Sequence, residues 1–244
     1  MTVGLFIPCY VNQFYPNAAI ATLELLEKQG LTVGYPVKQT CCGQPMANSG
    51  FSHITGDCDR LFIDNFSHFD YIVSPSGSCV LHIKEHLHTA GREAEAESIR
   101  GKIYELVEFF TDILHVTGIK ARFNHKVGIH QSCHGQRGLK LSSMSELVAP
   151  YFSKPMQLLS MVEGLEIVPL DRPDECCGFG GTFCVAEEAV SVKMGKDRVL
   201  DHIKHGAEFI TAADMSCLMH MEGILKRQKS TVKVLHIAEI LNSF

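Results

Sequence analysis

Cysteines are the residues of this chain that are best suited to chemistry. The chain has 244 residues and 10 cysteines, and eight of these recur as two ordered sets of four. Each set consists of one cysteine, then an adjacent Cys-Cys-Gly, then a further cysteine. The first set is Cys9, Cys41, Cys42 and Cys79, and the second is Cys133, Cys176, Cys177 and Cys217. Cys58 and Cys184 belong to neither set, and we expect them to pack as small apolar side chains.

The residues around the two sets also match, which indicates an internal repeat. Residues 3–9 and 127–133 are both apolar runs that end in cysteine, and residues 70–79 match residues 208–217. The blocks occur in the same order in both copies. We therefore predict two homologous halves, residues 1–122 and residues 123–244.

Within each half, short apolar runs alternate with longer amphipathic stretches, a pattern typical of βαβ units. We predict helices over residues 17–29, which Gly30 should end, and over residues 183–204. The predicted strands are residues 3–8, 31–37, 71–74, 127–130, 165–170 and 209–211. The predicted fold is α/β, with two Rossmann-like halves that each have a mostly parallel sheet flanked by helices.

All eight repeated cysteines lie at, or just beyond, the carboxyl end of a predicted strand. The carboxyl ends of parallel strands share one edge of the sheet, where open α/β folds build their binding sites. Each half should therefore gather four thiols at that edge.

Composition narrows the classes of function. The net charge is −5, with 22 basic and 27 acidic residues and no long basic run, which argues against nucleic-acid binding. The first residues lack the pattern of a signal peptide, and no membrane span is predicted. We therefore expect a reducing, cytoplasmic location, where clustered cysteines are more often metal ligands or catalytic groups than disulfides.

Four converging thiols allow several outcomes. They could bind an iron–sulfur cluster or a structural zinc ion, pack without a metal, or act as redox thiols. Adjacent cysteines suit a single zinc ion poorly, because neighbouring side chains diverge in an extended chain. A cluster with several irons spreads its coordination positions more widely. The pattern thus favours an iron–sulfur cluster and leaves a structural-zinc or metal-free scaffold as the alternative.

The repeated Cys…Cys-Cys-Gly…Cys pattern resembles the cysteine-rich CCG domain family, which includes the iron–sulfur subunits of glycolate oxidase and of anaerobic glycerol-3-phosphate dehydrogenase. Residues 38–45, 76–79, 176–183, 213–217 and 235–239 most closely resemble its lactate-utilization branch. This resemblance implies an iron–sulfur electron-transfer subunit of a multi-subunit oxidoreductase that converts L-lactate to pyruvate. It also implies two partners that turnover would require, a ferredoxin-like iron–sulfur subunit and a third lactate-utilization subunit.

The chain departs from the wider family at two positions. That family ends each repeat in Cys-x-x-Cys, whereas the first of these positions is Ser76 in one half and Asp214 in the other. Four thiols per half suit an ordinary cluster, [4Fe–4S] in preference to [2Fe–2S], with one or two clusters per chain and zinc as a possible replacement. Asp214 could cap the following helix or donate an oxygen ligand to iron.

Several histidines accompany the cysteines. His82 and His220 lie three residues after a repeat cysteine, about one helical turn away, where they could ligate a metal, hydrogen-bond a ligand or simply pack. His130 and His134 flank Cys133 without counterparts in the first half, so they are candidates to tune the second site. The glycine-rich residues 178–181 lack the last glycine of a dinucleotide fingerprint, and we interpret them as a turn that brings backbone N–H groups to a cluster.

Overall fold

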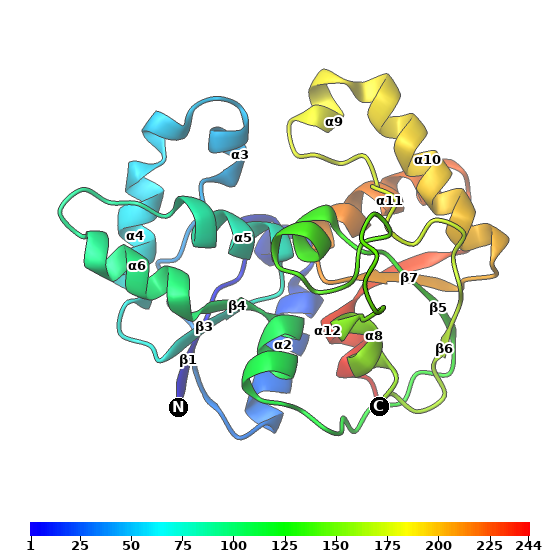
Figure 1. Cartoon of the computed structure of the whole chain (residues 1–244), viewed down its shortest axis with the longest axis horizontal. Coiled ribbons are helices and arrows are strands. Elements are labelled where there is room, and N and C mark those ends of the chain that lie inside the picture. Colours follow the sequence, from blue (N-terminus) through cyan, green and yellow to red (C-terminus); the bar gives the residue numbers. More distant parts are fainter.

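Two four-stranded sheets, both entirely parallel, form the centres of the two halves (Figure 1). The computed structural model describes residues 1–244. The strand order is β2-β1-β3-β4 in the first half and β6-β5-β7-β8 in the second. The strands are β1 (Thr2–Leu5), β2 (Thr32–Gly34), β3 (Tyr71–Ser74), β4 (Ile103–Glu105), β5 (Lys126–Ile129), β6 (Glu166–Ile167), β7 (Phe209–Ala212) and β8 (Lys233–His236). The predicted α/β class with two Rossmann-like halves is confirmed.

The two sheets share their register as well as their order. Val3 lies opposite Tyr71 in the β1–β3 pair, and Val127 lies opposite Phe209 in the β5–β7 pair. These are the residues that the sequence repeat aligns with one another. Equivalent residues therefore lie at equivalent places in the two halves.

Helices flank each sheet. In the first half they are α1 (Cys9–Phe14), α2 (Pro16–Lys28), α3 (Gln44–Asn48), α4 (Gly56–Phe66), α5 (Gly77–His86), α6 (Glu93–Lys102) and α7 (Leu106–Glu108). In the second half they are α8 (Lys154–Leu159), α9 (Phe183–Ala186), α10 (Glu188–Lys204), α11 (Met215–Arg227) and α12 (Ile237–Leu241). A short 3-10 helix, η1 (Ser52–Ile54), and two π-helical turns, η2 (Phe109–Ile113) and η3 (His134–Gly138), complete the chain.

The helix predicted over residues 17–29 corresponds to α2, and Gly30 follows it with a φ of 75°. The stretch predicted as one helix, residues 183–204, has both of its ends confirmed, but Glu187 leaves the helical conformation and divides it into α9 and α10. A tertiary contact holds the start of α10, since the Ser191 hydroxyl donates a hydrogen bond to the carbonyl of Gly178 at 2.7 Å. Periodicity alone could not reveal that contact. The short fourth strands, β4 and β8, were also not predicted from the sequence.

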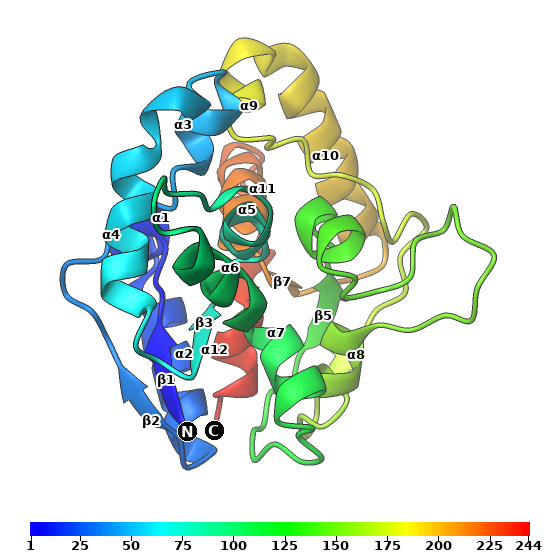
Figure 2. The ribbon, with the colours of Figure 1, turned by 60° about the vertical axis from the view of Figure 1, so that its left-hand side comes forward.

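The helices that follow the fourth strands connect the two halves reciprocally. Helix α7 follows β4 and packs against α8 of the second half, and α12 follows β8 and packs against α2 of the first. Figure 2 shows α12 beside α2. Lys28 at the end of α2 also donates a hydrogen bond to Asn242 at 2.7 Å. Buried apolar residues of both halves consequently form one continuous core.

The predicted division between residues 122 and 123 falls in the connection from η2 to β5, and it stays a prediction. None of the helices combines the length and the apolar character that crossing a membrane requires.

Candidate metal centre

The four repeat cysteines of the first half, Cys9, Cys41, Cys42 and Cys79, meet at the carboxyl edge of its sheet; we call them the first quartet. Cys9 begins α1 after β1, the adjacent pair precedes α3 after β2, and Cys79 lies in the first turn of α5 after β3. The Sγ atoms of Cys42 and Cys79 are 3.4 Å apart. Cys41 belongs to the same group, since the neighbouring thiols of Cys42 and Cys9 lower its pKa.

The second quartet, Cys133, Cys176, Cys177 and Cys217, repeats this arrangement in the second half. Cys133 directly precedes η3 after β5, the adjacent pair lies in the loop between β6 and α9, and Cys217 is in the first turn of α11. The thiols of this quartet influence one another, since Cys133 and Cys177 shift the pKa of Cys176, and Cys217 raises that of Cys177. The structure thus brings together the residues that the sequence predicted to meet, once in each half.

A glycine shapes the cysteine pair in both quartets. Gly43 and Gly178 have φ values of 89° and 85°, in the left-handed region that favours glycine. Their backbone N–H groups donate to the Sγ atoms of Cys41 and Cys176, in both cases at 3.4 Å. These N–H groups would stabilise negative charge on the sulfur atoms.

The thiols of each quartet shift one another's pKa values. The pKa of Cys41 is lowered because the thiols of Cys42 and Cys9 both hydrogen-bond to its sulfur, and the pKa values of these two partners are raised. In the second quartet, hydrogen bonds from Cys133 and Cys177 lower the pKa of Cys176 in the same way. A metal cation bound here would replace the remaining thiol protons and favour all four thiolates.

Both quartets open onto the same cleft. All eight cysteines line a cleft of about 590 Å³ between the halves, together with Tyr10, Phe179 and Met219. Helices α3 and α9 lie on either side of it at the top of Figure 1. Metal ions or clusters bound at the two quartets would therefore face the same cleft.

The two positions at which the chain departs from the wider family serve as helix caps. Ser76 is the N-cap of α5, and its hydroxyl accepts from the N–H of Cys79 at 3.4 Å. Asp214 is the N-cap of α11, and its Oδ1 accepts from the N–H of Ser216 at 3.1 Å. Its Oδ2 also accepts from the N–H of Ser78 in the first half at 2.7 Å. Of the two roles considered for Asp214, the structure supports the helix cap.

His82 and His220 do not join the sulfur atoms. His220 interacts through Nε2 with the carbonyl of Ser191 at 3.3 Å, and the ring of His82 packs beside that of His86, with centroids 5.1 Å apart. The remaining two cysteines also lie outside the quartets. Cys184 donates to the carbonyl of Gly181 at 3.0 Å, and both it and Cys58 are partly buried and unpaired.

His130 is different, because it lies against the second quartet. One of its ring nitrogens and the Sγ atoms of Cys177 and Cys217 are all within 4.8 Å of one another. The side chain is only 2% exposed, and burial together with the positive charge of Arg198 lowers the pKa of His130 to about 3. His134, its neighbour in sequence, belongs to no such group and begins η3.

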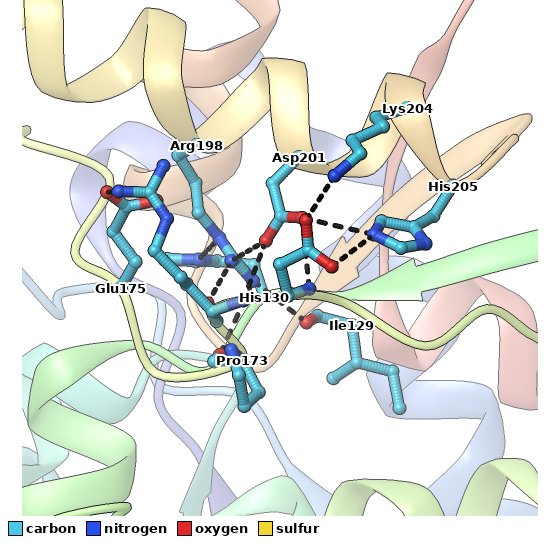
Figure 3. Close-up of polar contacts among 10 residues, drawn as sticks. Ile129, His130, Pro173, Glu175, Arg198, Asp201, Lys204 and His205 are labelled. Atoms are coloured by element: carbon cyan, nitrogen blue, oxygen red, sulfur yellow. Dashed lines mark hydrogen bonds and ion pairs between the residues drawn. The ribbon is translucent and has the colours of Figure 1, made fainter.

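Arg198 on α10 was not predicted from the sequence, and its side chain is fully buried. Its Nε donates to Nδ1 of His130 at 3.1 Å, and its Nη1 forms an ion pair with Asp201 at 3.3 Å (Figure 3). Other N–H groups donate to the carbonyls of Arg172 and Ile129. The periodicity of the sequence does not predict that this arginine is buried, since a charged residue on a helix is usually exposed.

The donor set suits a metal ion or a metal–sulfur cluster. Each quartet offers four thiol sulfurs, a glycine N–H aimed at one of them and partial burial. Thiolates are the ligands of iron–sulfur clusters and of structural zinc sites.

Two copies of a parallel α/β unit, each with a cysteine quartet at its strand ends, define a duplicated cysteine-rich domain. The CCG family, described as a cysteine-rich domain, matches residues 3–84 and 127–222 of the chain. The chain belongs to this family.

Its similarity to curated proteins extends over the full length. It is 41% identical over 248 residues to lactate utilization protein A of Geobacillus sp. (strain WCH70), with 100% of both chains covered. It is 39% identical over 247 residues to lactate utilization protein A of Bacillus subtilis (strain 168), again with 100% of both covered. Among solved structures, a hypothetical protein from Helicobacter pylori shares the fold, with a TM-score of 0.61 at 14% identity over 98% of this chain and 48% of that one.

Proposed function

We propose that this chain is an iron–sulfur electron-transfer subunit of a complex that oxidises L-lactate to pyruvate. The observation that carries the proposal is the pair of thiol quartets, built alike at the strand ends of two parallel sheets and lining one cleft. The names of the full-length relatives supply the link to lactate utilization. The enzyme class would be an oxidoreductase that needs its partner subunits for turnover.

The eight quartet cysteines are the proposed ligands, four for each cluster. A bound iron–sulfur cluster would supply one-electron transfer, so the two electrons released from each lactate would leave singly. This chain's residues would hold the clusters and direct the N–H groups of Gly43 and Gly178 at sulfur. Four thiols can hold a [4Fe–4S] or a [2Fe–2S] cluster, and [4Fe–4S] is the type proposed here.

Thiolate ligands have to stay reduced, which fits the reducing cytoplasm as the proposed compartment. The proposed partners are a ferredoxin-like iron–sulfur subunit, which would accept the electrons, and a third lactate-utilization subunit. Co-purification of the chain with these proteins, followed by an assay for lactate-dependent dye reduction, tests this part of the proposal. Reduction of the dye that persists without this chain would contradict it.

A structural-zinc scaffold is the competing function, because the same four thiols can hold zinc. Anaerobic purification followed by iron, sulfide and zinc analysis, with EPR of the reduced protein, separates the two. We expect iron and acid-labile sulfide in stoichiometric amounts and an EPR signal on reduction. Stoichiometric zinc without iron would reject the iron–sulfur proposal. Rapid alkylation of the thiols in metal-free protein would instead indicate thiol-based redox catalysis.

A further inference from the structure

The two quartets have different surroundings at one pair of equivalent positions, His130 and Phe6. Each follows the first strand of its half, and each donates its backbone N–H to the neighbouring strand, His130 to Thr211 at 2.7 Å and Phe6 to Val73 at 2.9 Å. Phe6 packs against other aromatic rings. The first half therefore has an apolar side chain where the second half has an imidazole.

Arg198 determines which nitrogen of His130 carries the hydrogen. A guanidinium group can donate hydrogen bonds but cannot accept them. Its Nε–H donates to Nδ1 of His130 at 3.1 Å, so Nδ1 must be the acceptor and the hydrogen must lie on Nε2. Arg198 cannot turn away easily, because Asp201 and the carbonyls of Arg172 and Ile129 hold its other N–H groups (Figure 3).

The Nε2–H group of His130 is buried and has no hydrogen-bond partner within the chain. Buried donors are rarely left without an acceptor, so this N–H calls for an acceptor that the chain itself does not supply. The His130 ring lies against Cys177 and Cys217, with the ligand atoms within 4.8 Å of one another. Nδ1 is already occupied by Arg198, so Nε2 is the ring nitrogen that still has a hydrogen to donate.

We infer that His130 is a positioning residue that donates a hydrogen bond from Nε2 to sulfur of the cluster held by the second quartet, and thereby makes the two clusters electronically unequal. This inference deepens the proposed function and rests on it. A hydrogen bond to cluster sulfur stabilises the more negative, reduced state and raises the reduction potential. The second quartet would then be the site of higher potential, because Phe6 offers the first quartet no such donor.

The same geometry argues against His130 as an iron ligand. Ligation through Nε2 requires a lone pair on that nitrogen and places the hydrogen on Nδ1. That hydrogen would face the N–H of Arg198 at 3.1 Å. The contact with Arg198 therefore keeps the hydrogen of the His130 ring on Nε2, so that Nε2 can donate a hydrogen bond but cannot ligate iron.

Redox titration of the anaerobically purified chain, followed by EPR, tests the inference. The signal that is lost in Cys177→Ser identifies the second cluster. We expect His130→Leu to keep its iron and to lower the midpoint potential of that cluster alone. His130→Gln should retain a potential close to the wild-type value, because its amide oxygen can accept from Arg198 while its N–H donates. Phe6→Leu is the matched control in the first half and should leave the second cluster unchanged.

An unchanged potential in His130→Leu with full iron content would overturn the inference and leave the proposed function intact. Absence of iron from the wild-type chain would reject the proposed function and this inference with it. Should the Leu variant fail to fold, electron spin echo spectroscopy of wild-type protein labelled with ¹⁵N-histidine gives a separate measurement. Weak nitrogen coupling to the second cluster is expected for a hydrogen bond, whereas the strong coupling of a ligand, or none at all, would overturn the inference.

Discussion

Ser76 and Asp214 occupy equivalent positions in the two halves and lie opposite each other as an antiparallel backbone bridge between them. Each caps the helix that carries the last cysteine of its quartet. Asp214 also binds the N–H of Ser78 across the interface at 2.7 Å, and the hydroxyl of Tyr10 donates to it at 3.2 Å. One carboxylate therefore holds the first turns of α5 and α11 together, and the two quartets with them.

Replacing Asp214 should weaken the interface between the halves. The side chain is 1% exposed, and Asp214→Ala would leave buried donors on both halves without an acceptor. We expect a loss of about 2–4 kcal/mol in the free energy of unfolding, the sum of a lost helix cap and unpaired buried donors. Urea denaturation at pH 7 measures this change.

Ser76→Ala is the matched control for Asp214→Ala, since it removes a cap at the equivalent position without a charged contact across the interface. Ser76→Ala should lower the free energy of unfolding by about 1 kcal/mol. Equal losses in the two variants would contradict the role of Asp214 in joining the halves.

Single cysteine variants should separate the two sites. Cys42→Ser and Cys177→Ser each remove one proposed ligand from one half only, so each should lower the iron content by about one cluster and leave the fold intact. Iron and sulfide analysis with far-UV circular dichroism gives both readouts. Cys58→Ser and Cys184→Ser are controls that should keep all their iron, and full iron in a quartet variant would remove that residue from the site.

The turn after the second cysteine pair should tolerate no side chain. A Cβ atom on Gly178 would lie 2.7 Å from the carbonyl oxygen of Ser191, and the residue has a φ of 85°. Gly178→Ala should therefore lower the free energy of unfolding by about 3 kcal/mol. About 1–2 kcal/mol of this loss comes from the left-handed conformation, and the rest comes from displacement of the backbone. Its iron content should fall as well.

Gly30 offers a control with similar backbone strain, because its φ is 75° and nothing lies within 4 Å of an added Cβ. Gly30→Ala should lower the free energy of unfolding by only about 1 kcal/mol. Denaturation curves of the two variants can be compared directly, and similar losses would show that the contact with Ser191 is unimportant.

His236 should make stability depend on pH. It is fully buried as the N-cap of α12, and burial lowers its pKa from 6.5 to about 4. As pH falls below 6.5, His236 becomes protonated in the unfolded chain, whereas in the folded chain it stays neutral down to about pH 4. The contribution of His236 to the free energy of unfolding is therefore complete above pH 6.5. It is lost as pH falls from 6.5 to 4, by up to about 3 kcal/mol.

Denaturation of the wild type and of His236→Asn at several pH values from 7 to 5 measures this dependence. Asparagine is also a good N-cap, but it does not titrate. The variant should lose less stability than the wild type across that range. Parallel pH curves for the two proteins would show that His236 does not contribute.

Some features of the site followed directly from the order of residues. Strands end where apolar runs end, and parallel strands share an edge, so the positions of Cys9, Cys79, Cys133 and Cys217 already implied convergence. Short strands and helix breaks were harder to predict. Strand β4 has only three residues, and the break at Glu187 is a single residue between two helices, so neither leaves a clear periodic pattern.

The sequence by itself determined the duplication, the parallel α/β class and the grouping of four thiols in each half, because these depend on local patterns and on strand direction. Only the tertiary structure decided that both quartets line one cleft, that Asp214 binds the first turns of helices in both halves, and that Arg198 is buried behind His130. Those relationships join residues far apart in the chain. They depend on how α7 and α12 pack across the interface, which no local pattern specifies.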